Sequence, residues 1–118
     1  MSRRYRLRAA ETGKSYEYFF VWSRAVNRPE GQGPGSDYVF VVTPDQQPPF
    51  TLRVFVSDRA LAAWRLVHGR ELDSREVYAA AKMRLFRALD ELPCLRGEWL
   101  NLLVDETTIE ELLAPLDL

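Results

Sequence analysis

Apolar and polar positions alternate between Arg4 and Arg24, and this period of two predicts a pair of β-strands. The first strand places Tyr5, Leu7 and Ala9 on one face and Arg4, Arg6 and Arg8 on the other. The second strand runs from Ser15 to Arg24 and places its aromatic residues on one face: Tyr16, Tyr18, Phe20 and Trp22. A two-residue turn at positions 13–14 would pair Ala9 with Tyr18, so that both apolar faces meet the same core.

Two further strands are predicted beyond a loop. Residues 27–36 contain three glycines and two prolines among mostly polar neighbours, a composition typical of a flexible surface loop. The following stretch, from Asp37 to Thr43, is apolar on both faces and is therefore expected to be a central strand. The stretch from Phe50 to Val56 alternates again and predicts a fourth strand.

The second half of the chain has the signals of helices. Ser57 or Asp58 can cap a helix that ends at His68-Gly69, because glycine readily adopts the left-handed conformation beyond a helix. Asp73 and Glu76 have the spacing of a capping box, and Pro93 ends the helix that follows. Residues 97–104 are expected to form a fifth strand. Thr107 with Glu110, or Thr108 with Glu111, would cap a short last helix.

The predicted order is four strands, two helices, one strand and one helix (ββββααβα). Because strands and helices are segregated, this order predicts an α+β fold, with a mainly antiparallel sheet of about five strands and helices packed on one face. The strands before and after the two helices are expected to be parallel neighbours. The length of 118 residues suits a single domain covering residues 1–118, with the flexible Gly/Pro-rich loop at 27–36.

Composition narrows the classes of protein to consider. A single cysteine excludes an internal disulfide, and no apolar run reaches the roughly 18 residues of a membrane span. The basic residues near Arg3 are not followed by the apolar stretch of a secretory signal, so we expect a cytoplasmic protein without membrane contact. The charge is unevenly distributed: residues 1–28 hold seven cations and two anions, whereas residues 92–118 hold one cation and six anions.

No arrangement of residues predicts catalysis, a metal or a cofactor. His68 and Cys94 are the strongest candidates for a base or a nucleophile, and no partner residue accompanies either in the sequence. Gly13-Lys14-Ser15 resembles the end of a phosphate-binding loop, but Arg8 stands where that loop requires glycine. We therefore expect a protein that is not an enzyme and needs no cofactor.

A sheet with helices on one face leaves its other face available to a partner, and this face carries the predicted site. Apolar side chains set among arginines are typical of a protein–protein interface. The residues assigned to it are Arg4, Arg6, Arg8, Phe19, Val21 and Phe55, with Arg53 on the same side. The preferred hypothesis is a small protein-interaction domain that binds a protein partner and self-associates as a homo-oligomer.

Two other functions stay open. Three exposed arginines on an N-terminal strand could contact phosphates, so nucleic-acid binding is the alternative, although the protein as a whole is slightly acidic. A ligand pocket under the Gly-rich loop would need polar groups beside Trp22, Trp64 or Trp99.

Overall fold

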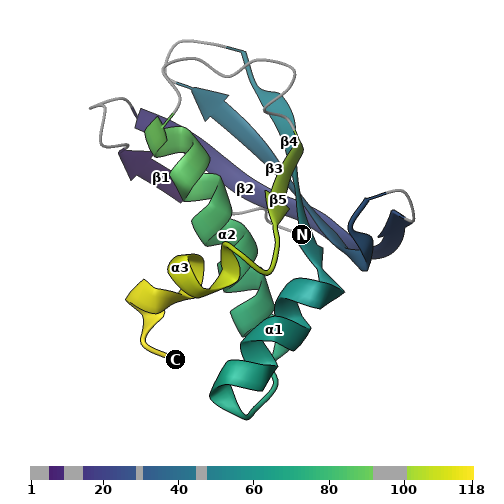
Figure 1. The fold of residues 1–118 in the computed structure, drawn as a ribbon. Coiled ribbons are helices and arrows are strands. Elements are labelled where there is room, and N and C mark those ends of the chain that lie inside the picture. The colour runs from purple at the N-terminus through teal and green to yellow at the C-terminus, as the bar shows by residue number, and fades with distance from the viewer. Residues whose placement is uncertain (1–5, 10–14, 29–30, 45–47, 92–100) are drawn as a thin grey trace.

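The computed structural model describes residues 6–9, 15–28, 31–44, 48–91 and 101–118. Five strands, three α-helices and a short 3₁₀ turn make up the described fold (Figure 1). The strands are β1 (Arg6–Ala9), β2 (Ser15–Arg28), β3 (Gly33–Pro44), β4 (Phe50–Ser57) and β5 (Asn101–Val104). The helices are α1 (Asp58–His68), α2 (Ser74–Glu91) and α3 (Ile109–Leu113), followed by the turn η2 (Ala114–Leu116).

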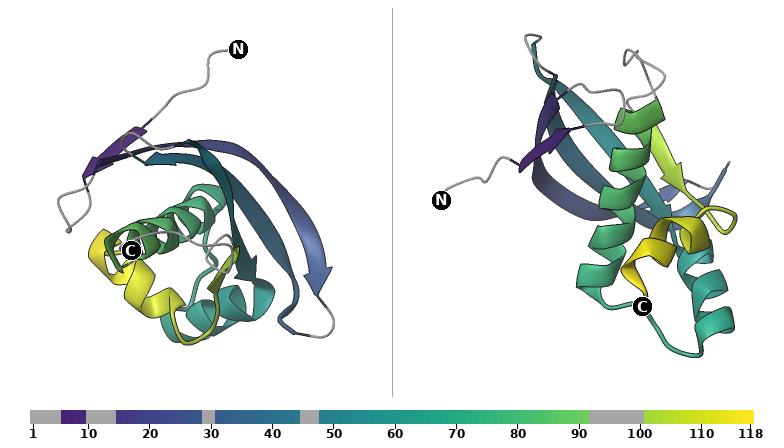
Figure 2. Two further views of the ribbon diagram at one scale, coloured as in Figure 1. Left: turned by 90° about the horizontal axis from the view of Figure 1, so that it is seen from above. Right: turned by 90° about the vertical axis from the view of Figure 1, so that its left-hand side faces the viewer.

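The strands form one sheet in the order β1-β2-β3-β4-β5. Neighbouring strands from β1 to β4 are antiparallel, whereas β5 runs parallel to β4. The α+β class and the parallel pairing of the last two strands are thus confirmed, and the sheet is mixed. Figure 2 shows the sheet curving around α2, with the helices gathered on one side of it.

The main core lies between the sheet and α2. Its sheet side is formed by alternate residues of β2, β3 and β4, and its helix side by small and branched residues. The sheet contributes Tyr16, Tyr18, Phe40, Val42, Leu52, Val54 and Val56, and α2 contributes Ala80, Ala81, Leu85, Ala88 and Leu89. The burial of Tyr16 and Tyr18 agrees with the alternation predicted for β2. Ala80 and Ala81 are fully buried, so the short side chains let α2 approach the sheet closely.

Local capping signals determine where α1 and α2 begin. The Ser57 hydroxyl accepts a hydrogen bond from the Ala60 N–H (3.1 Å), and Gly69 ends α1 at a φ of 72°. The Asp73 carboxylate accepts from the Glu76 N–H, and the Glu76 carboxylate accepts from the Asp73 N–H, both at 2.9 Å. The predicted caps and the capping box are therefore confirmed.

The start of α3 differs from its prediction. The carboxylate of Asp105 accepts hydrogen bonds from the N–H groups of Thr107 (3.0 Å) and Thr108 (3.1 Å). Thr108 is the N-cap but makes no capping bond with its side chain, because its hydroxyl is engaged with Asp105. An aspartate before the helix thus performs the function that was assigned to a threonine.

The predicted register of the first hairpin is wrong. β1 pairs Arg6 with Tyr18, Leu7 with Glu17 and Ala9 with Ser15, whereas Ala9 was expected opposite Tyr18. The shift of three residues is odd, so it exchanges the two faces of the strand. The register therefore aligns Arg6 and Arg8, rather than Leu7, with the tyrosines of the core. The turn predicted at positions 13–14 lies outside the described residues.

The predicted loop at 27–36 is largely strand. β2 continues to Arg28 and β3 already begins at Gly33. Glycine is required in this strand for packing as well as for turning, because a Cβ on Gly35 would lie 2.6 Å from Cζ of Phe55 and would also clash with the Val56 carbonyl oxygen. Gly35, one of the glycines that suggested a loop, therefore allows close contact within the sheet.

A β-bulge interrupts β2 at Val21. Phe20 pairs with Phe40, but the next pair is Trp22 with Val39, so β2 uses one more residue than β3 at this point. Beyond the bulge, the alternation of β2 is inverted. Trp22 consequently lies on the face opposite to Tyr16 and Tyr18, which corrects its predicted place in the core.

Candidate interaction surface

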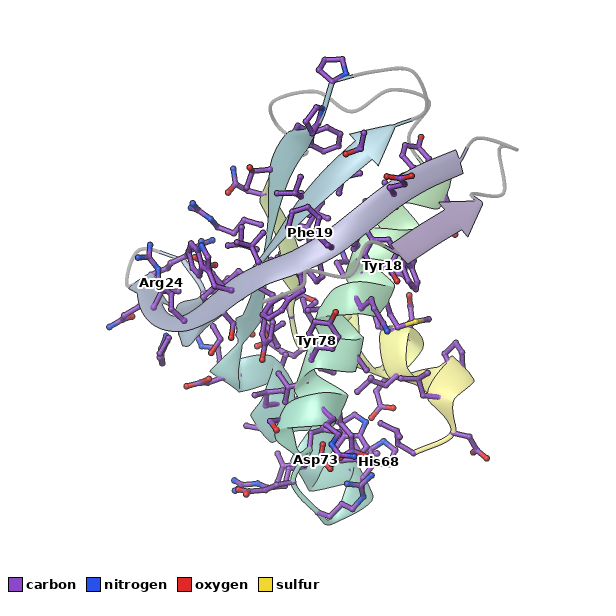
Figure 3. All side chains as sticks on the ribbon, turned by 180° about the vertical axis from the view of Figure 1, so that it is seen from behind. Tyr18, Phe19, Arg24, His68, Asp73 and Tyr78 are labelled. Carbon is purple, nitrogen blue, oxygen red and sulfur yellow. The ribbon has the colours of Figure 1, made fainter. Side chains whose placement is uncertain are left out.

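The register defines a second face of the sheet, on which none of the described helices packs. Paired residues of antiparallel strands lie on the same face, so Trp22, Val39 and Arg53 share it. We call this side the helix-free face. Figure 3 views the molecule from this side, with β2 in front of α2. The face includes Phe19, Trp22, Arg24, Val26 and Arg28 of β2, Gly35, Asp37, Val39 and Val41 of β3, and Thr51, Arg53 and Phe55 of β4.

Phe55 is fully buried on this face although no described helix covers it. Its ring lies against Gly35 of the neighbouring strand, which has no side chain to keep it away. The guanidinium of Arg28 covers the ring, with its central carbon 4.5 Å from the ring centroid. A cation over an aromatic face is attracted by the ring quadrupole. Arg28 therefore shields the Phe55 ring from solvent and also binds it electrostatically.

Asp37 is a buried carboxylate between two arginines. Its side chain is 2% exposed, accepts a hydrogen bond from Nη2 of Arg28 (2.9 Å) and lies 3.8 Å from Nε of Arg53. Burying a carboxylate is costly unless it is paired and hydrogen-bonded, and Arg28 supplies both forms of compensation. Since two guanidiniums share one carboxylate, Arg28, Asp37 and Arg53 together carry a net positive charge.

Trp22 is the large apolar side chain that the bulge places on the helix-free face. It is 39% exposed, and the guanidinium carbon of the exposed Arg24 lies 5.1 Å from its ring centroid. Arg24 therefore flanks the indole without covering it completely. We call Trp22, Arg24, Arg28 and Arg53 together the Trp22 surface.

The structure distributes the predicted site residues differently. Phe19 and Phe55 lie on the helix-free face, but they are only 5% and 0% exposed, so their expected exposure is wrong. Val21 is the partly buried extra residue of the bulge. Arg53 is on the helix-free face, as expected. Burial of Phe55 follows from its contacts with Gly35 and Arg28, neither of which the strand pattern reveals.

The N-terminal arginines are not brought together with these residues. Arg4 lies outside the described residues, and the register aligns Arg6 and Arg8 with Tyr18 and Tyr16, which belong to the core on the helix side. Arg24 and Arg28, which the alternation pattern did not assign to the site, occupy the helix-free face instead. The signal for them was their spacing of four in β2, and only the bulge determines on which face they fall.

The aromatic residues on the helix side form packing contacts. The Phe20 ring lies 5.2 Å from that of Tyr78 in a T-shaped arrangement and 5.8 Å from that of Phe40. Burial raises the pKa of Tyr38, which lies 6.3 Å from Tyr78 between ring centroids. These contacts are those of a sheet packed on a helix, so the aromatic stripe of β2 is divided between the core and the helix-free face.

His68 belongs to a contact between helices. Its Nε2 lies 2.8 Å from Oε1 of Glu110, and its ring stacks on Trp64 of the same helix at 4.0 Å. The pair joins α1 to the segment containing α3. Cys94, the other candidate for catalysis, lies outside the described residues. Within the described ranges, no group of three or more His, Cys, Asp or Glu residues is arranged to hold a metal ion.

A pocket of about 230 Å³ adjoins this contact. Its lining comes from α1 and from residues 110–118, and includes Trp64, His68, Glu110 and Asp117. Residues 31–36 do not line it, so it is not the pocket expected beneath the Gly-rich loop. Trp99 lies outside the described residues.

None of the described helices combines the length and the apolar character needed to cross a membrane. Comparisons of the chain with protein-family models, with curated proteins and with solved structures found no match.

Proposed function

We propose that this protein is a non-enzymatic interaction domain that associates with a second copy of itself through the helix-free face. The observation that carries the proposal is the exposure of Trp22 beside Arg24, on a face of the sheet that also carries Arg28 and Arg53 and lies away from the described helices. Tryptophan and arginine are the residues most enriched among those that dominate binding energy at interfaces.

The energetics favour Trp22 as the anchor of such an interface. Apolar area removed from water contributes about 25 cal/mol per Å², so the exposed part of one indole can contribute about 1–2 kcal/mol. The partly buried Val26 and Val41 lie on the same face and extend the apolar area. The arginines can form bidentate bonds with carboxylates at the margin of the contact.

The chain itself contains a segment rich in the carboxylates that these arginines could bind. Residues 105–118 contain five carboxylates and no lysine or arginine. A second copy therefore offers carboxylates to the arginines of the Trp22 surface, and opposite charges favour both the encounter and its orientation.

Sedimentation velocity over a range of protein concentrations tests the proposal. We expect concentration-dependent association of the unaltered protein and an association constant at least about tenfold lower for Trp22→Ser, a loss of about 1.4 kcal/mol. The matched control is Leu66→Ser, because Leu66 is 83% exposed on α1 and is not part of the helix-free face. A strictly monomeric protein up to about 1 mM, or equal association of the two variants, would contradict the proposal.

Nucleic-acid binding is the second candidate, and one specific observation favours it. An exposed indole next to guanidinium groups can stack on a base while the arginines contact phosphates. Titration of labelled single- and double-stranded oligonucleotides at two salt concentrations distinguishes this function. Nucleic-acid binding through the helix-free face predicts salt-sensitive binding that Arg24→Glu weakens. Arg6→Glu tests the binding that the sequence predicted for the N-terminal arginines. Undetectable affinity at low salt would eliminate it.

A further inference from the structure

In the proposed self-association, on which this inference rests, the helix-free face of one copy binds a defined surface of the next. The Trp22 surface is cationic, because its carboxylate, Asp37, is buried between Arg28 and Arg53 and is already bonded to Arg28. The exposed Glu17 of the same face lies on the other side of the bulge. A two-fold contact that joins this surface to its own copy would place guanidiniums opposite guanidiniums. Like charges brought together at an interface are unfavourable, so the electrostatics oppose a symmetric contact.

A complementary surface lies around α3. Glu106, Glu110, Glu111 and Asp117 are exposed there. Arg87 and His68 pair with two of these residues, through contacts of 3.1 Å to Glu111 and 2.8 Å to Glu110. Four carboxylates therefore meet one arginine and one histidine, and the surface retains negative charge. We call these four residues, with Leu116 and Leu118, the α3 surface.

The α3 surface also carries apolar area. The side chains of Leu116 and Leu118 are 38% and 41% exposed, and they lie next to Asp117 in the sequence. The α3 surface thus offers apolar side chains flanked by carboxylates, and the Trp22 surface offers an apolar side chain flanked by arginines. Apolar character and charge can thus be complementary at the same contact.

The two surfaces lie on different sides of the molecule. α3 packs against α2 in the helix layer, whereas the Trp22 surface lies on the other side of the sheet (Figures 2 and 3). One copy therefore cannot join its own two surfaces. Contact between different patches of successive copies is heterologous, and it leaves one of each patch free after every addition.

We infer that the protein assembles head to tail: the Trp22 surface of one copy receives the α3 surface of the next. Trp22 packs between the leucines, and Arg24 and Arg53 pair with the carboxylates of the neighbour. Each contact leaves a free surface at both ends of the assembly, which then grows as a series of oligomers or closes into a ring.

Complementation between two variants tests the inference. The first variant, Trp22→Ser with Arg24→Glu, removes the Trp22 surface but keeps the α3 surface. The second variant, Glu106→Lys with Leu116→Ser, removes the α3 surface but keeps the Trp22 surface. Each variant alone is expected to be monomeric in sedimentation velocity. Their equimolar mixture is expected to form a dimer and no larger species, because the one intact contact joins one copy of each.

The outcomes separate this inference from the proposal on which it rests. If the second variant self-associates like the unaltered protein, the α3 surface is not involved and the head-to-tail contact is overturned, while self-association through the helix-free face stands. A mixture that stays monomeric while both variants show the unaltered far-ultraviolet circular dichroism also overturns it. If the unaltered protein is monomeric, or binds only oligonucleotide, both proposals fail. Formation of the mixed dimer supports both and shows that both variants are folded.

Discussion

Gly35, Phe55 and Arg28 together explain how part of the helix-free face is buried without a helix above it. The missing side chain at Gly35 admits the Phe55 ring, and the Arg28 guanidinium covers the ring while also bonding Asp37. Three strands thereby become linked through side chains as well as through their backbones. The exposed surface that remains is centred on Trp22, which directly follows the bulge residue Val21 and is therefore closer to the bulge than Arg28 is.

Gly35→Ala is expected to destabilise the protein by about 1–3 kcal/mol, because the new methyl group meets a backbone carbonyl and an aromatic ring that cannot both move away. Urea unfolding followed by circular dichroism measures the change. Gly31→Ala is the matched control, since a Cβ there meets no atom within 4 Å. Equal stability of the two variants would show that the contact between Gly35 and Phe55 is not tight.

The carboxyl of Asp105 predicts a pH dependence. Hydrogen bonds, the largest from the Thr107 hydroxyl, hold the pKa of Asp105 below its ordinary value. A folded-state pKa below the unfolded one gives stability that is present above the unfolded pKa and is lost as the pH falls. Between about pH 5 and about pH 3, the free energy of unfolding should therefore decrease more for the unaltered protein than for Asp105→Asn, as urea titrations at each pH would show. Parallel decreases would contradict this role.

At the level of helices and strands, the sequence predicts those features that depend on residues close together in the chain. Ser57, Gly69 and the Asp73–Glu76 pair each act within one turn of helix, and all were identified correctly. Pairing between strands depends on distant residues. The alternation pattern therefore could not predict the offset of β1 against β2 or the bulge at Val21. Because these two features determine which residues share a face, the candidate site was predicted only in part. Arg53 was placed correctly, whereas Trp22 was assigned to the core.

Removal of the capping residue Asp73 tests how much the cap at the start of α2 contributes to the free energy of unfolding. Asp73→Ala should lower the free energy of unfolding by about 1 kcal/mol, because the Glu76 N–H loses its acceptor in the first turn of the helix. Ser74→Ala, one position further along, is the control and should have a much smaller effect. Denaturant titration of the two variants provides the comparison, and equal losses would mean that the carboxylate of Asp73 does not stabilise the helix.

Part of the charge separation along the sequence persists in the folded molecule. Exposed carboxylates lie around α3 in the helix layer, whereas Arg24 and Arg28, two of the seven cations of residues 1–28, lie on the helix-free face of the sheet. If the basic first part and the acidic last part of the chain were in contact, their opposite charges would compensate each other within one molecule. The distance between the two groups in the fold instead leaves each one available to another molecule.

Salt should therefore weaken self-association. Raising the ionic strength from about 0.05 M to about 0.5 M shortens the screening length several-fold and weakens attraction between exposed charges. We expect a decrease of about tenfold or more in the association constant of the unaltered protein, measured by sedimentation equilibrium. Association that strengthens with salt would indicate an apolar contact without electrostatic complementarity.

The bulge at Val21 makes β2 unusually tolerant of losing one residue at one place. A chain lacking Val21 would continue from Phe20 directly to Trp22 in regular pairing, so the indole and both following arginines would stay on the side they occupy now. Loss of Ser23, only two positions further on, would instead place Val21 opposite Val39 and Trp22 opposite Tyr38. The indole would then turn to the helix side, while Arg24 stayed paired with Asp37. A variant lacking Val21 should consequently still assemble, and one lacking Ser23 should not. Single-residue deletions in β2 thus distinguish the bulge from every regular position of the strand.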